Sequence, residues 1–155
     1  RGLDAKEIGM KDPRFPGWLL FGASFSLMAL GPRPAVPAIV GGAWVALLAM
    51  AAVLTWRRTG LRLAASGMAL AAAAMALYTR VLVRTDDFFA APPGELAAFL
   101  AAALACPLLF LAQSRTQPGR WARWKLRSEG CTAADVLLFR HIPDLRGEEP
   151  AAPPS

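Results

Sequence analysis

Long apolar stretches, separated by short polar loops, constrain this chain more than any other feature. The clearest stretch covers residues 37–56 and contains no ionisable side chain. At about 1.5 Å per residue, a helix of this length crosses the ~30 Å hydrocarbon layer of a bilayer. Soluble domains seldom contain unbroken apolar stretches this long, and 55% of the chain is hydrophobic. The pattern therefore predicts an all-α fold, that of a polytopic helical membrane protein.

The sequence predicts four transmembrane helices within residues 15–113, after a polar tail at 1–14. Their expected limits are about 16–31, 37–56, 61–83 and 95–112. The first stretch would reach only about 22 Å as a helix, so it needs local thinning of the bilayer in order to cross. Lying flat in the interface or re-entering the membrane are the alternatives for this stretch.

Positive charges indicate how these helices are oriented. Arg57, Arg58 and Arg62 lie between the second and third stretches, and a further group of Arg and Lys residues follows the fourth. The positive-inside rule places both groups on the cytoplasmic side, or on the matrix side in an organelle. With four spans, both termini lie on that side of a bacterial or organellar inner membrane. Because the cations flank apolar stretches and form no single basic face, the net charge of +6 does not indicate a nucleic-acid partner.

Small residues at four-residue spacing predict where helices approach one another. In lipid, burying leucine between helices gains no hydrophobic free energy, so helix contact depends on close van der Waals approach at small side chains. The helix-packing candidates are Gly22, Gly42, Gly67 and Ala71. Their partners are helices of this chain or of a neighbouring subunit, and the sequence does not distinguish the two.

A charged group at the end of the third stretch is the best candidate for a binding site. Arg80 and Arg84 are one helical turn apart on one face, and Asp86, Asp87 and Glu95 follow. Anchoring at the bilayer edge with local ion pairs is one interpretation, since arginine side chains snorkel toward water. Contact with a lipid headgroup, a quinone or a partner subunit is another. A divalent metal with a diphosphate is the least supported, because further carboxylates are missing.

The apolar stretches lack the residues that most chemistry in membranes needs. The single histidine, His141, lies in the C-terminal tail, so neither bis-histidine haem ligation nor a Ser-His-Asp set can be assembled within the membrane. No stretch has an acidic residue in its middle, which argues against coupled transport. We therefore predict no catalytic, metal-binding or cofactor-binding residues, and bound lipids alone.

The tail after residue 113 carries two further signals. Trp121, Arg123, Trp124 and Lys125 predict a basic segment in the headgroup layer, in contact with lipid or a partner. A capping box at 132–135 precedes an apolar helix, which must dock beneath its own bundle or on another protein. We treat residues 114–147 as this interfacial and docking tail, cytoplasmic in the four-span topology, and 148–155 as disordered because they are proline-rich.

These features favour a non-catalytic accessory, assembly or structural subunit of a larger membrane complex, with energy-transducing assemblies as one class of such complexes. Its expected partners are membrane lipids and other membrane-protein subunits. A small homo-oligomeric pore or transporter is the alternative, and a lipid-modifying enzyme that uses Asp86 and Asp87 with the two nearby arginines is a third.

Overall fold

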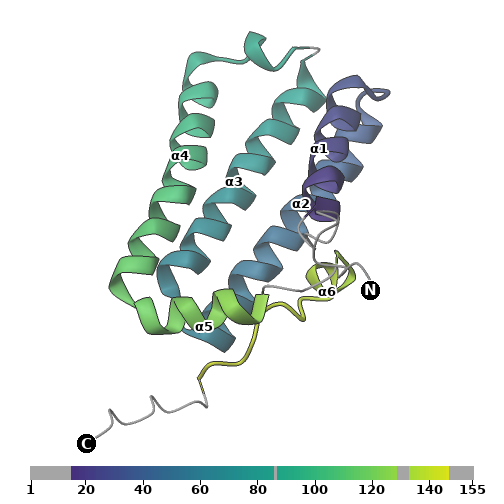
Figure 1. Cartoon of the computed structure of the whole chain (residues 1–155). Coiled ribbons are helices and arrows are strands. Elements are labelled where there is room, and N and C mark those ends of the chain that lie inside the picture. Colours follow the sequence, from purple (N-terminus) through teal and green to yellow (C-terminus); the bar gives the residue numbers. More distant parts are fainter. Residues whose placement is uncertain (1–14, 86, 129–132, 147–155) are drawn as a thin grey trace, which may run out of the picture.

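The computed structural model describes residues 15–85, 87–128 and 133–146, and this part of the chain is all-helical (Figure 1). The α-helices are α1 (Phe15–Leu30), α2 (Ala35–Leu54), α3 (Arg62–Arg84), α4 (Pro93–Thr116), α5 (Pro118–Ser128) and α6 (Ala133–Leu137). A π-helical turn, Thr55–Thr59, extends α2, and a short 3-10 helix, Phe88–Ala90, precedes α4.

Three helices are long and apolar enough to cross a membrane. They are Ala35–Thr59 with 25 residues, Arg62–Arg84 with 23 and Pro93–Thr116 with 24. The described residues contain helices and no strand, which confirms the predicted all-α fold for this part of the chain. The length and composition of the three long helices fit an integral membrane protein. With 16 residues, α1 reaches only about 24 Å. Whether α1 crosses the bilayer as a fourth span stays a prediction.

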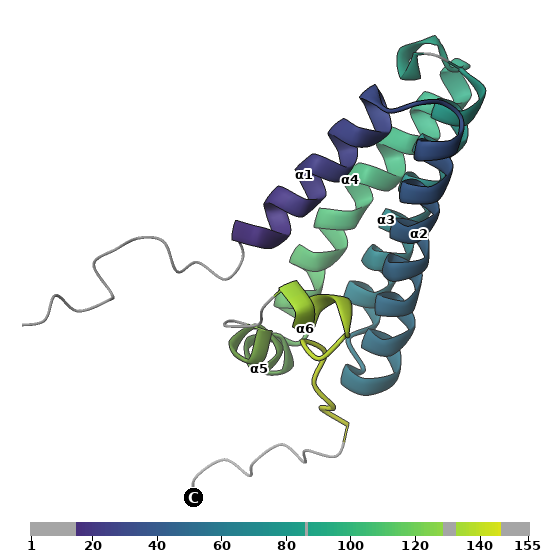
Figure 2. The same cartoon turned by 90° about the vertical axis from the view of Figure 1, so that its right-hand side faces the viewer.

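Helix α3 lies between α2 and α4, and successive helices run in opposite directions (Figure 1). Helix α1 packs beside α2 near the end where the two are connected and leans away from the bundle toward its own first residue (Figure 2). The buried residues of α3 include Ala64, Ala65, Ala72 and Ala74. Alanine suits this central position because its short side chain allows close approach on two sides.

Two glycines mark the tightest approaches to α3. A Cβ atom at Gly41 of α2 would collide with the side chain of Thr79, whose Oγ1 is fixed by a 2.8 Å hydrogen bond to the Met75 carbonyl. A Cβ atom at Gly67 would lie 3.2 Å from the Cys106 carbonyl oxygen of α4. Both positions therefore allow neighbouring helices to pack closely.

The four helix-packing candidates from the sequence lie in different surroundings. Gly67 is buried against α4, and Ala71 on the same helix is partly buried. Gly22 and Gly42 are exposed, and a Cβ atom at either would meet no described atom within 4 Å. Contact of Gly22 or Gly42 with a second chain stays a prediction. Inside this chain the closely packed glycine of α2 is Gly41, one position before the candidate.

Candidate functional site

The two ends of the bundle differ in composition. At one end, which we call the loop end, α1 connects to α2 and α3 connects to α4. At the other, the basic end, α2 connects to α3, and α5 runs crosswise from the end of α4 (Figures 1 and 2). The described cations at the basic end are Arg57, Arg58, Arg62, Arg115, Arg120, Arg123, Lys125, Arg140 and Arg146.

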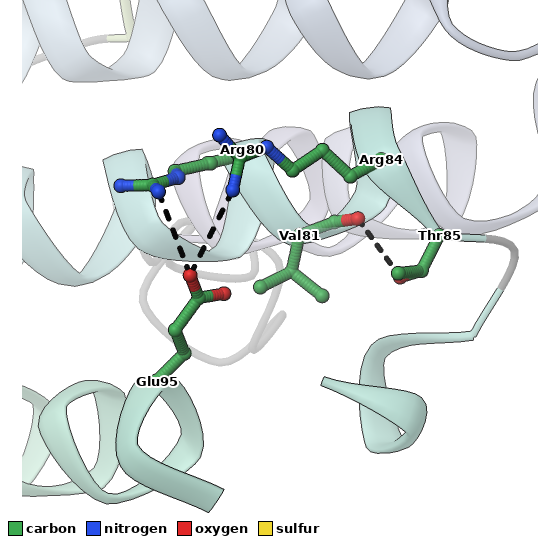
Figure 3. Close-up of polar contacts among 5 residues, drawn as sticks. All are labelled: Arg80, Val81, Arg84, Thr85 and Glu95. Atoms are coloured by element: carbon green, nitrogen blue, oxygen red, sulfur yellow. Dashed lines mark hydrogen bonds and ion pairs between the residues drawn. The ribbon is translucent and has the colours of Figure 1, made fainter. Parts of the chain in front are cut away.

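The charged candidate at the loop end forms one cluster (Figure 3). Glu95 Oε1, in the first turn of α4, lies 3.7 Å from Arg80 Nη2 and 3.9 Å from Arg84 Nη1. Both arginine side chains are more than half exposed, at 53% and 60%. Each exposed ion pair contributes only about 0–1 kcal/mol. Since two cations share one carboxylate, the cluster keeps an excess of positive charge and can attract an anionic group.

Asp87, one of the two predicted aspartates, does not join this cluster in the described structure. Asp86 lies outside the described residues. Asp87 Oδ1 accepts a hydrogen bond of 3.0 Å from the Phe89 backbone N–H and so caps the short 3-10 helix. No described ion pair links Asp87 to Arg80 or Arg84. The structure thus brings Glu95 to the two arginines and gives Asp87 a local structural contact.

An aromatic cluster supports the loop end. The ring of Tyr78 on α3 lies 5.1 Å from Phe25 of α1, 4.9 Å from Phe88 and 6.1 Å from Phe99 of α4, measured between centroids. Such tilted pairs add to the energy of apolar burial. They hold three helices and the connecting loop together behind the charged cluster.

Arg33 ties the α1–α2 connection to the same end. Its Nη1 donates a 2.6 Å hydrogen bond to the Thr85 carbonyl, and its Nη2 donates to the Ala29 carbonyl at 3.2 Å. Carbonyl groups at helix C-termini lack partners within their own helix, so a guanidinium is well suited to them. Sequence reasoning missed this role, because nothing in the sequence pairs Arg33 with residue 85.

At the basic end, a buried glutamine caps a helix that is remote in sequence. Gln113 of α4 is 1% exposed, and its Oε1 accepts from the Leu63 N–H at 2.9 Å and the Ala64 N–H at 3.3 Å. Helix α3 begins after Gly60, which has a φ of 69°, and has no side-chain cap at its own N-cap residue. Gln113 therefore supplies a missing acceptor for the first turn of α3.

Helix α5 carries the predicted tryptophans. Trp121 and Trp124 have centroids 5.0 Å apart, and Trp121 also lies 5.9 Å from Phe110 of α4. Arg123 is partly buried and Lys125 is exposed. Trp124 Nε1 is buried with no hydrogen-bond partner among the described residues. Aromatic contact thus joins α5 to the end of the spanning helices.

The chain after α6 returns to the end of α2. The Leu145 N–H donates to the Arg58 carbonyl at 2.8 Å, and Arg146 Nη2 donates to the Trp56 carbonyl at 3.1 Å. Ile142 and Leu145 are 1% and 0% exposed. The sequence left open whether this segment covers its own bundle or a partner, and these contacts are with its own bundle.

The apolar residues just before this segment remain uncovered. Helix α6 ends at Leu137, and Val136, Leu137 and Leu138 are 48%, 45% and 60% exposed. The predicted capping residue Thr132 lies outside the described residues. His141 follows, and burial lowers its pKa, opposed by the Asp135 carbonyl, 3.5 Å from its Nδ1, and by the Asp135 carboxylate.

Among the described residues, no group of three or more His, Cys, Asp or Glu side chains is placed to hold a metal ion. The expected absence of catalytic and cofactor-binding residues stays a prediction. No protein-family model, curated protein or solved structure matches this chain.

Proposed function

We propose that this chain is a non-catalytic accessory or structural subunit of a larger membrane-protein complex. The observation that supports this most is the outward surface of α4. Gln113 is the one fully buried residue of this helix, all of which the structure describes. The exposed leucines on it are Leu100, Leu104, Leu108 and Leu111, at 56–64% exposure. Helix α4 packs against α3 on one side, and its other faces, which carry these leucines, offer a surface to helices of other subunits.

Helix α2 offers a second outward surface. Gly42 is exposed on it, together with Ala38 and Ala46 at the same four-residue spacing. Small residues at this spacing allow another helix to approach closely. In this proposal the surface is covered by a neighbouring subunit in the assembled complex.

The proposed topology has four spans with both termini on the cytoplasmic or matrix side of a bacterial or organellar inner membrane. Two observations support it: the N-terminal end of α1 is directed toward the basic end, and α5 and the described residues 133–146 lie at that end (Figures 1 and 2). Reporters fused before residue 14 and after residue 155 are expected on one side, and one inserted near Pro93 on the other. Opposite locations for the two termini would contradict the fourth span.

The tail is proposed to contribute the remaining partner contact. Its exposed apolar residues, Val136, Leu137 and Leu138, need a cover that the described chain does not provide. Helix α5, with its tryptophans and cations, suits the headgroup layer. An energy-transducing complex is one setting in which such a subunit would act.

Purification in a mild detergent tests this proposal directly. The tagged full-length chain is expected to co-purify with other membrane proteins in a fixed ratio. Changing Leu104 and Leu108 together to alanine should weaken that association. The matched control changes Leu27 and Leu30 of α1 together to alanine, which removes the same number of atoms from exposed positions outside both proposed surfaces. A chain that runs alone as a defined multimer and conducts solute in liposomes would contradict the proposal and support the pore alternative.

The tail is tested in the same way. Replacing Trp121 and Trp124 with alanine, and separately ending the chain after Lys125, should weaken partner association but leave membrane insertion intact, because the apolar helices are unchanged. Normal co-purification of both variants would remove the tail from the proposed interface.

A further inference from the structure

A groove opens between α2 and α3 near the basic end of the bundle. Its volume is ≈ 310 Å³, and small side chains line much of it, including Ala52, Ala65 and Ala69. Val53 of α2 and Trp56 of the π-helical turn also line it and are 47% and 46% exposed, so the groove is open to the surroundings. In a spanning protein those surroundings are lipid.

Arg57 lines one end of the groove, and two further arginines contact Trp56 at that end. Arg57 is among its lining residues, and the Arg62 guanidinium carbon lies 5.5 Å from the centroid of the Trp56 ring. Arg146 donates a hydrogen bond to the Trp56 carbonyl. No described carboxylate forms an ion pair with Arg57 or Arg62. The charged end of the groove is therefore complementary to an anion.

The dimensions favour a single hydrocarbon chain over a helix of another protein. A volume near 300 Å³ is at the low end for ligand sites, which measure about 300–1,000 Å³. A helix with side chains is about 10–12 Å across and does not enter a trough of this size. An acyl chain does, and the alanine methyl groups leave room for it along the helix pair.

We propose that this groove binds one anionic phospholipid of the leaflet on the basic side. The acyl chain lies along Ala52, Ala65 and Ala69, and the phosphate pairs with Arg57 and Arg62. The planar guanidinium matches phosphate oxygens in pairs, and Trp56 lies at the depth where indole rings prefer the membrane boundary. The site requires a membrane-spanning chain but does not depend on the accessory-subunit role, since it needs no partner protein.

The experiment uses the purified full-length chain in membranes that contain spin-labelled phosphatidylglycerol or phosphatidylcholine. The fraction of immobilised label measures the preference for the anionic lipid. Changing Arg57 and Arg62 to glutamine should reduce that preference roughly tenfold for each arginine, because a direct charge-assisted hydrogen bond to a phosphate oxygen contributes about that factor. The matched control, R115Q with R140Q, removes equal charge at the same end outside the groove and should retain the preference.

A second variant tests the groove itself. Ala69→Phe fills it and should reduce immobilisation of the anionic lipid, whereas Ala73→Phe, one turn further along the same exposed face, should not. Circular dichroism and the thermal midpoint establish that each variant is folded.

Three results would overturn the proposal. One is a preference that survives in the Arg57 and Arg62 double variant, or that falls equally in the control pair, since a diffuse surface potential then explains it. Another is normal binding to folded Ala69→Phe. The third is displacement of the label by inorganic phosphate alone, which would assign the arginines to a free anion. Each result leaves the co-purification test unaffected.

Discussion

The loop end and the basic end of this bundle are held together by different interactions. At the loop end, aromatic rings pack around Tyr78, and Glu95 makes long ion pairs with two exposed arginines. At the basic end, the buried Gln113 accepts hydrogen bonds from the first turn of α3, and the returning tail donates a hydrogen bond to the Arg58 carbonyl. Exposed ion pairs contribute little, but a buried polar group that loses its partner costs much more. Replacing a polar residue that makes these contacts should therefore destabilise the chain more at the basic end than at the loop end.

Loss of the Gln113 acceptor is expected to have the largest effect. Gln113→Leu keeps the volume but leaves the Leu63 and Ala64 N–H groups without their acceptor. We expect the free energy of unfolding to fall by about 2–4 kcal/mol. Unfolding by SDS in mixed micelles measures it, with Gln117→Leu at an exposed position as the control. Equal, small losses in both variants would remove the distinction between the two ends.

The next effect concerns close packing in the loop-end half of the α2–α3 contact. Gly41→Ala forces a methyl group into Thr79 and should destabilise the chain by about 1–3 kcal/mol. Gly42→Ala is a matched control, because it makes the same change one position along, where nothing described lies within 4 Å. The same unfolding assay applies. If the two variants are equally stable, α2 is rotated so that Gly41 does not face Thr79.

Glu95→Gln tests the exposed ion pairs of the loop end, which we expect to contribute less than the contacts of Gln113. It removes the carboxylate shared by Arg80 and Arg84, and the free energy of unfolding should change by only about 0–1 kcal/mol. A loss as large as that of Gln113→Leu would mean that the loop-end cluster is structural. A normal stability with weakened co-purification would instead indicate that Glu95 orients the arginines for a partner.

The smallest effect is a pH dependence of tail docking. Because burial lowers the pKa of His141 from its ordinary value of 6.5, the docked tail favours the neutral imidazole. The contribution of neutral His141 to the stability of the docked tail is complete above pH 6.5. It decreases as the pH falls through 6.5 toward the lower pKa of the folded state. The nearby Asp135 oxygens oppose this shift and limit its size.

Hydrogen exchange at the Leu145 amide, corrected for the intrinsic rate, measures this dependence. Protection should decrease below about pH 6.5 in the natural chain and remain constant in His141→Gln. A pH-dependent loss of protection that persists in the variant would assign the effect to another group.

The sequence predicted the helices well and their mutual contacts only in part. The expected stretch at 61–83 corresponds closely to α3 (Arg62–Arg84), while α4 continues to Thr116, beyond the expected 112. It continues because Gln113, although polar, is buried against the start of α3 and does not end the helix. The charged candidates Arg80 and Arg84 were identified by their helical spacing. Glu95, placed near them by the loop, completes the cluster.

The sequence did not predict which residues of an apolar helix face its neighbours, because this depends on the rotation of the helix about its own axis. Gly41 and Gly42 are adjacent, so they point about 100° apart on a helix of about 3.6 residues per turn. In a soluble helix a polar face would show which of them points inward. The residues of α2 are apolar on every side, so composition does not distinguish its lipid-facing surface from its packed one.

The sequence by itself determined that the chain forms long apolar helices and that positive charge gathers at their connections. This follows because backbone hydrogen bonds in a helix are local, and the length of an apolar stretch sets the length of helix that lipid accepts. The tertiary structure alone decided that Gln113 caps α3, that Gly41 contacts Thr79, and that Leu145 returns to Arg58. These contacts join residues far apart in the chain, and their geometry depends on how apolar helices rotate and pack against one another.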